Sequence, residues 1–116
     1  CSWSRGLGDV YKRQVNNVES FELEDLYQLV NNNENFASGV NLEIYEIINK
    51  EYVKARVYER GVGETDACGS GALCMFNYLS KTNRIGTNGY ILYPGGELNL
   101  RFENEDLYLS GEVIYL

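Results

Sequence analysis

Residues 58–79 read YERGVGETDACGSGALCMFNYL and carry the strongest structural signal in the chain. The stretch begins like a strand, passes through a turn with two glycines and two acidic residues, and leads through Cys68 and Gly-Ser-Gly into an almost wholly apolar run. A helix that is apolar on every side has to be enclosed by other elements. We therefore predict a core helix over Ala72–Leu79, with the rest of the chain around it and Cys68 at its N-terminus.

Cys68 occupies a position with chemical consequences. The first turn of a helix has N–H groups without acceptors and a partial positive charge, which favour a thiolate or a bound carboxylate. A thiol whose pKa is lowered in this way exchanges a proton with a carbon acid near neutral pH. Gly69 and Gly71 would let a ligand approach the backbone closely. On the residues alone, a cysteine buried as a small hydrophobic side chain is the stronger interpretation.

The segments on either side of this stretch predict a mixture of helix and strands. Ser20 is a suitable N-cap for an outer helix through Val30, and Val15–Val18 resembles the tail of a preceding strand. Residues 40–48 and 51–59 predict a hairpin. Further strands are expected over 89–93, 97–102 and 107–115. The predicted fold class is α+β: a curved, mostly antiparallel sheet wrapped around a central buried helix.

Glu59 stands at the end of the second hairpin strand. Apolar and polar residues alternate along this strand, and one further step places Glu59 on the inward side and Arg60 on the outward side. An inward carboxylate is costly unless a partner or a reaction uses it. An ion pair with Arg56 or Arg60 and a loss of register at the turn explain the pattern equally well. Glu64 and Asp66 are interpreted as acids of the turn and of the helix start.

Residues 1–14 differ in character from the rest of the chain. They contain the only Trp and three basic residues in an otherwise acidic protein, and they resemble translated adapter or assembly sequence. We expect a non-native segment over residues 1–14 and a single domain over residues 15–116. An ordinary exposed N-terminal arm is the alternative interpretation.

Composition excludes several classes of function. The 116 residues are 44% hydrophobic, enough for one core, and carry a net charge of −7 without a basic cluster, so nucleic acid is not an expected partner. No apolar run approaches the roughly 20 residues that span a bilayer, so a membrane is not expected either. Three cysteines and no histidine predict neither a disulfide framework nor a zinc site, and suit a reducing cytoplasm.

Residues 58–65 (YERGVGET) and 67–72 (ACGSGA) closely resemble the signature of the C-terminal lobe of diaminopimelate epimerase. Weaker similarities lie at 40–41 (VN), 93–98 (YPGGEL) and 109–111 (LSG). The resemblance covers about residues 15–116. It implies a fold of two such lobes with the active site in the cleft between them, of which only the second is expected here.

The resemblance also assigns roles to individual residues. Cys68 matches a catalytic cysteine, one of two thiols that remove and return the α-proton of an amino acid on opposite faces without a cofactor. Glu59 matches a carboxylate that assists the thiol chemistry. Substrate contacts are implied for Asn41, Glu59, Arg60, Gly69 and Ser70, the last two through N–H groups toward the α-carboxylate. No metal is implied.

The activity implied is that of an isomerase of lysine biosynthesis, located in the cytoplasm, which interconverts LL- and meso-diaminopimelate. The family's first lobe, with its own cysteine and a Gly-Asn-Pro-His motif, has no counterpart in the sequence, so the fragment is expected to be inactive alone. The full-length protein is a candidate homodimer. Two alternatives stay open: a lobe of a related two-thiol racemase with another substrate, and a non-catalytic binding or dimerisation module of the same fold.

Overall fold

The computed structural model describes residues 9–32 and 40–110, and within these ranges the chain forms seven strands and two helices. In chain order they are β1 (Asp9–Gln14), α1 (Leu23–Asn31), β2 (Val40–Ile47), β3 (Tyr52–Glu59), β4 (Gly63–Thr65), α2 (Gly69–Lys81), β5 (Asn88–Tyr93), β6 (Gly96–Glu103) and β7 (Asp106–Ser110). The predicted α+β class is confirmed. The predicted hairpin and the helix that follows Cys68 are present, the helix being longer at both ends.

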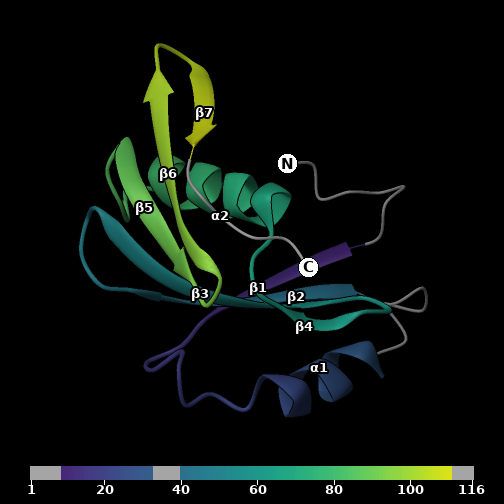
Figure 1. Ribbon diagram of the computed structural model, residues 1–116. Coiled ribbons are helices and arrows are strands. Elements are labelled where there is room, and N and C mark those ends of the chain that lie inside the picture. The colour runs from purple at the N-terminus through teal and green to yellow at the C-terminus, as the bar shows by residue number, and fades with distance from the viewer. Residues whose placement is uncertain (1–8, 33–39, 111–116) are drawn as a thin grey trace.

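The strands form one mixed sheet in the order β1-β2-β3-β5-β6-β7, with β4 paired to β3. β1 runs parallel to β2 and β3 runs parallel to β5, whereas the other neighbours are antiparallel. Parallel neighbours need a long connection that crosses back over the sheet. Helix α1 provides it between β1 and β2, and helix α2 provides it between β3 and β5 (Figure 1).

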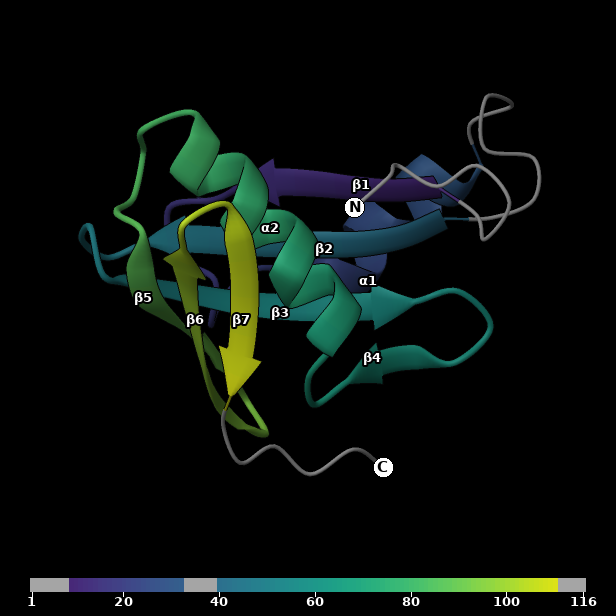
Figure 2. The same cartoon turned by 90° about the horizontal axis from the view of Figure 1, so that it is seen from above.

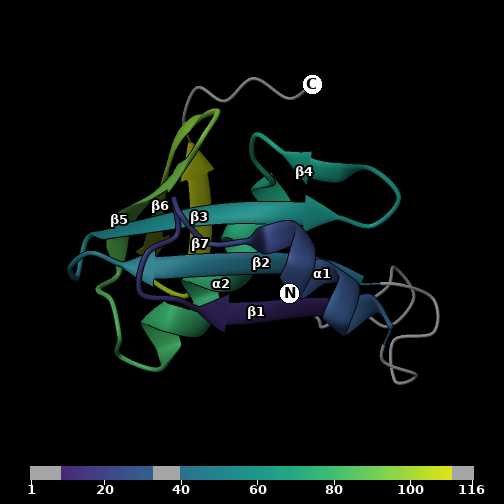
Figure 3. The same ribbon diagram turned by 90° about the horizontal axis from the view of Figure 1, so that it is seen from below.

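The two helices cover opposite faces of β1, β2 and β3. Figure 3 shows α1 lying across these strands from below, and Figure 1 shows α2 on the other side of the same strands. As a result β2 is buried on both faces: Leu42 and Ile44 belong to the core beside α1, and Tyr45 belongs to the core beside α2. Strand β3 turns its apolar residues Val53, Ala55 and Val57 toward α2. The space between β2, β3 and α2 is therefore the interior against which any site at the start of α2 is built.

Helix α2 lies in a corner of the sheet. Strands β1, β2 and β3 run beneath it and β5, β6 and β7 stand beside it (Figures 1 and 2). Ala72, Met75, Phe76 and Leu79 are almost fully buried, and burial of a Met, Phe or Leu side chain contributes roughly 1.5–3 kcal/mol. Tyr78, in contrast, is 41% exposed. The helix thus presents one edge to solvent in the described part of the chain.

Helix α1 begins two residues later than predicted, at Leu23, with Glu22 as an N-cap that makes no side-chain capping hydrogen bond. The reason lies upstream. The side-chain oxygen of Asn17 accepts the N–H groups of Glu19 (3.1 Å) and Ser20 (3.3 Å), which closes a turn through Ser20. Asparagine commonly closes such turns with its own side chain. Ser20 as the N-cap was therefore wrong.

Two strands were not predicted. β1 pairs with β2, and this pairing ends at the N–H of Val15, which donates to Tyr45 O (2.8 Å). Residues 15–18 follow the strand and are not part of it, so Val15–Val18 as the tail of a strand was wrong. β4 occupies part of the predicted turn and pairs with the end of β3. The last predicted strand is present as β7 to Ser110, and residues 111–115 lie outside the described residues. Neither helix of the described chain has the length and apolar character required to cross a bilayer.

Candidate active site

Cys68 caps the N-terminus of α2. Its backbone is extended (φ −143°, ψ 106°), and its sulfur accepts the N–H of Gly71 at 3.4 Å and lies 3.5 Å from the hydroxyl oxygen of Ser70. The Cys68 carbonyl accepts the N–H of Ala72 (2.9 Å). Among residues 9–32 and 40–110 no acceptor is found for the N–H groups of Gly69 and Ser70. These two N–H groups at the positive end of the helix can donate to a carboxylate of a ligand.

The proton affinity of Cys68 differs from the expectation. The sequence predicts a lowered pKa, but the structure raises the pKa of the Cys68 thiol, mainly because the side chain is half-buried. Hydrogen bonds from Ser70 and Gly71 act in the opposite direction, and the charges of Glu43 and Glu59 add to the rise. The hydrogen bonds at the helix N-terminus lower the pKa, but desolvation, with the two nearby carboxylates added to it, outweighs them. Cys68 is thus held as a thiol at neutral pH.

Glu59, the last residue of β3, lies near this thiol. It follows the buried Val57 in the alternation of the strand, it is half-buried, and its Oε2 accepts the hydroxyl of Thr65 in β4 at 2.5 Å. Its charge acts on both Cys68 and Glu43. The prediction that Glu59 points inward is confirmed. The explanation through Arg56 is wrong, because that guanidinium binds another carboxylate.

Arg56 forms a structural cluster on the opposite face of β3. Its Nε and Nη2 each lie 2.7 Å from a carboxylate oxygen of Glu64, and its Nη1 donates to the carbonyls of Val18 and Phe21, both at 2.8 Å. Fork-like pairing of this kind is stronger than a single ion pair. Glu64 is therefore a partner of Arg56 across β3 and β4, and its interpretation as an acid complementing the helix was wrong.

Asn41 and Arg60 are joined directly. The side-chain oxygen of Asn41, at the start of β2, accepts the backbone N–H of Arg60 at 2.7 Å. Asn41 is half-buried and Arg60 is exposed. The bond fixes the start of the turn that follows β3, so Asn41 positions the backbone from which the Arg60 side chain extends. Cys68, Glu59, Gly69 and Ser70 meet at the start of α2, and the Asn41–Arg60 pair lies at the end of the same strand β3.

The sequence reasoning missed Glu43. This residue of β2 is 1% exposed, its Oε1 accepts the Tyr93 hydroxyl at 2.5 Å, and the same hydroxyl lies 3.4 Å from the Cys68 carbonyl oxygen. The predicted hairpin could have indicated its burial. Glu43 lies directly opposite Val57, and directly opposite residues share a face of the sheet. Since Val57 was predicted to point inward, Glu43 points inward as well. Burial raises the pKa of Glu43 to about 7, against hydrogen bonding from Tyr93 and the charge of Lys12, which lower it.

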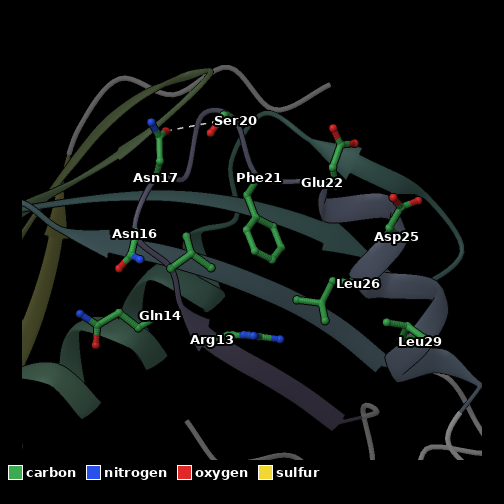
Figure 4. A pocket seen from close by; sticks show the side chains of 11 residues that line it. Arg13, Gln14, Asn16, Asn17, Ser20, Phe21, Glu22, Asp25, Leu26 and Leu29 are labelled. Atoms are coloured by element: carbon green, nitrogen blue, oxygen red, sulfur yellow. Dashed lines mark hydrogen bonds between the residues drawn. The ribbon is translucent and has the colours of Figure 1, made fainter.

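A separate hollow lies on the α1 side of the sheet. It has a volume of about 670 Å³, and the side chains that line it lie between residues 13 and 29 and include Arg13, Phe21, Asp25 and Leu26 (Figure 4). The predicted site residues lie instead at positions 41 and 59–70, toward α2. The hollow is therefore distinct from the candidate active site.

Comparison with known proteins gives a consistent result. The family model described as Diaminopimelate epimerase matches residues 2–116. A protein named diaminopimelate epimerase from Brachyspira hyodysenteriae (strain ATCC 49526 / WA1) is 38% identical over 104 residues, which cover 87% of this chain and 36% of that protein. One of the same name from Xanthomonas euvesicatoria pv. vesicatoria (strain 85-10) is 33% identical over 105 residues, 89% of this chain and 37% of that protein. The chain thus spans little more than a third of the length of these curated relatives.

Fold and site together define an α+β protein with a thiol and two carboxylates gathered at the start of a helix. Within this class, the match over residues 2–116 is decisive. The chain belongs to the diaminopimelate epimerase family.

Proposed function

We propose that this chain is one lobe of a diaminopimelate epimerase, an isomerase of lysine biosynthesis that interconverts LL- and meso-diaminopimelate without a cofactor. One observation supports the assignment most strongly: in a member of this family, Cys68 caps α2 beside the N–H groups of Gly69 and Ser70, which have no acceptor among the described residues. A thiol and a carboxylate-binding helix start are the two elements that the reaction requires of one lobe.

Inversion of an amino-acid α-carbon requires a base on one face and an acid on the other. The base takes the α-proton, and the electron pair of the broken C–H bond stays on the carbon. The Cys68 thiol, protonated at neutral pH, then gives its proton to the opposite face of that carbon, forming the new C–H bond and leaving a thiolate. In the reverse direction this thiolate is the base. The second thiol belongs to the part of the protein outside this chain.

Negative charge builds on the α-carboxylate as the carbanion forms. The N–H groups of Gly69 and Ser70 bind that carboxylate and stabilise the charge, which lowers the barrier. Arg60 contacts the substrate as a guanidinium suited to a carboxylate, Asn41 contacts it beside Arg60, and Glu59 assists the proton transfers of Cys68. The distal end of the substrate is bound by the other lobe.

The domain organisation follows the same proposal. Residues 15–116 form the second lobe, in which the sheet wraps around α2 as a central helix, and residues 1–14 are non-native, although the family match extends over residues 2–116. Residues 9–14 nevertheless pair with β2, because strand pairing uses backbone groups that any sequence supplies. With one of two thiols, this chain alone is inactive. The complete protein acts in the cytoplasm, as a homodimer.

The test uses a chimera in which residues 15–116 replace the matching segment of the Brachyspira hyodysenteriae relative. Conversion of LL- to meso-diaminopimelate is followed by chiral chromatography. We expect conversion by the chimera and a loss of at least about 1,000-fold in Cys68→Ala, the scale of a missing acid–base group. A Tyr78→Ala variant, changed on the exposed edge of α2, should remain active. Conversion by Cys68→Ala at the rate of the chimera would refute the proposal.

A further inference from the structure

Glu43 is a buried acid that the proposed reaction does not use. It lies on β2 at 1% exposure, enclosed by α2, and the reacting thiol begins that same helix. Its carboxylate is so close to the helix that a Cβ atom on Gly71 would stand 2.5 Å from Oε2. Gly71 is also the residue whose N–H the Cys68 sulfur accepts. The carboxylate and the sulfur therefore share one neighbour in the first turn of α2.

The geometry points to Glu43 as a positioning residue for Cys68: a buried carboxyl whose change of charge behind the helix start sets how readily the thiol ionises. When Glu43 is charged, its negative charge opposes the partial positive charge of the first turn and disfavours a thiolate at Cys68. When Glu43 is neutral, that opposition is removed. This coupling joins two groups of the same chain. Its consequence for catalysis rests on the proposed function, in which Cys68 transfers the α-proton.

Each element around Glu43 contributes a charged or titratable group. Lys12 of β1 and the hydroxyl of Tyr93 of β5 favour its charged form, whereas Glu59 of β3 disfavours it. On α2 the group that faces it is Cys68 itself. Desolvation exceeds all of these effects, and the pKa of Glu43 rises from an ordinary 4.5 to about 7. Its charge therefore changes around neutral pH.

Tyr93 links the two groups physically. Its hydroxyl donates to Glu43 Oε1 at 2.5 Å and lies 3.4 Å from the carbonyl oxygen of Cys68. With Glu43 charged, the hydroxyl proton is held by the carboxylate. With Glu43 protonated, the carboxyl O–H donates to the Tyr93 oxygen, and the hydroxyl is released to donate to the Cys68 carbonyl. Protonation of Glu43 thus changes both the charge and the hydrogen bonding at the N-cap.

The test measures the ionisation of Cys68 without any substrate. The 116-residue chain is alkylated with iodoacetamide from pH 6 to pH 10, and modification of Cys68 is quantified by peptide mass spectrometry. Removal of the buried negative charge in Glu43→Gln should raise the rate at pH 8 about three- to tenfold, because more thiolate is present. The matched control is Glu46→Gln, which changes a half-buried carboxylate on the same strand that accepts the N–H of Val18. This control should leave the rate unchanged.

A second variant keeps the inference testable if Glu43→Gln does not fold. Tyr93→Phe removes the hydrogen bond that lowers the pKa of Glu43, so Glu43 should stay neutral to higher pH and alkylation should be faster than in the unmodified chain between pH 7 and 8. The alkylation rates of Tyr93→Phe and of the unmodified chain should converge above pH 9. Equal rates in both variants and the unmodified chain, or a ¹³C titration of the Glu43 carboxyl with a pKa near 4.5, would overturn the inference. Loss of activity in the chimera tests the proposed function separately.

Discussion

The carboxylate of Glu43 rests against the backbone of Gly71, where an added Cβ atom would stand 2.5 Å from Oε2. A glycine at this helical position is normally unfavourable by about 1 kcal/mol relative to alanine. Here a methyl group would fit only if the carboxylate moved, and that carboxylate is fully buried and held by the Tyr93 hydroxyl. The contact ties the middle of β2 to the first turn of α2 and so fixes the position of the Cys68 cap.

We expect Gly71→Ala to lower the free energy of unfolding by about 2 kcal/mol, because overpacking against a fully buried side chain outweighs the helix preference of alanine. In a Glu43→Ala background the same change should be neutral or stabilising. Urea denaturation of the two single variants and the double variant gives the coupling energy. Equal effects of Gly71→Ala in both backgrounds would contradict the contact.

The raised pKa of Glu43 predicts a pH-dependent stability. Since the pKa is about 7 in the folded chain and near 4.5 when unfolded, the folded state binds more protons between these values. The contribution is complete below about pH 4.5 and is lost as pH rises through 7. The unfolding free energy should fall by on the order of 3 kcal/mol over this window, from Glu43 alone.

The check is urea denaturation at pH 5 and pH 8 of the unmodified chain and of Glu43→Gln. The difference between the two pH values should be smaller in the variant, which cannot ionise there. A Glu46→Gln variant controls for the general effect of a removed carboxylate. An identical pH dependence in all three proteins would show that Glu43 does not titrate in this range.

Arg56 predicts a stability effect remote from the thiol. Arg56→Lys loses the paired contacts with Glu64 and the bonds to the carbonyls of Val18 and Phe21, so we expect a loss of about 2 kcal/mol. Glu64→Gln should reduce the stability less, because Arg56 still donates to the carbonyls of Val18 and Phe21. Thermal unfolding followed by circular dichroism measures both. An Arg56→Lys variant as stable as the unmodified chain would show that the paired contacts of Arg56 do not stabilise the fold.

Asn41 allows a distinction between support and substrate contact. In the chimera, Asn41→Asp keeps an oxygen that can accept the N–H of Arg60, but it adds a negative charge beside the proposed position of a substrate carboxylate. We expect unchanged thermal stability and a KM at least about tenfold higher, from repulsion between like charges. Unchanged kinetics in Asn41→Asp would assign Asn41 to the backbone of the turn alone.

The features predicted from sequence were those with a local cause. Alternation along residues 51–59 gave the hairpin and the inward side of Glu59, and the apolar run after Cys68 gave α2. Ser20 failed as an N-cap because the Asn17 side chain closed a competing turn. β1 could not be foreseen, because its pairing with β2 uses backbone groups in a segment without strand-like patterning.

The electrostatics of the site were harder to predict, because they depend on residues that lie far from Cys68 in the sequence. The helix N-terminus beside Cys68 is visible in the sequence, and it alone predicts a lowered pKa. Desolvation comes from the packing of β2, β3 and β5 around the helix start, and the charge of Glu43 comes from a strand far earlier in the chain. Only the assembled sheet shows that these effects exceed the local one.

The central claim is that Cys68 carries a proton to and from an amino-acid α-carbon, and α-hydrogen exchange in heavy water tests it most directly. LL- and meso-diaminopimelate are each incubated with the chimera and with Cys68→Ala, and deuterium at the α-carbon is measured by mass spectrometry. We expect exchange of both stereoisomers with the chimera and a loss of at least about 100-fold for one or both with Cys68→Ala. Exchange of both stereoisomers at the chimera's rate in Cys68→Ala would contradict the claim.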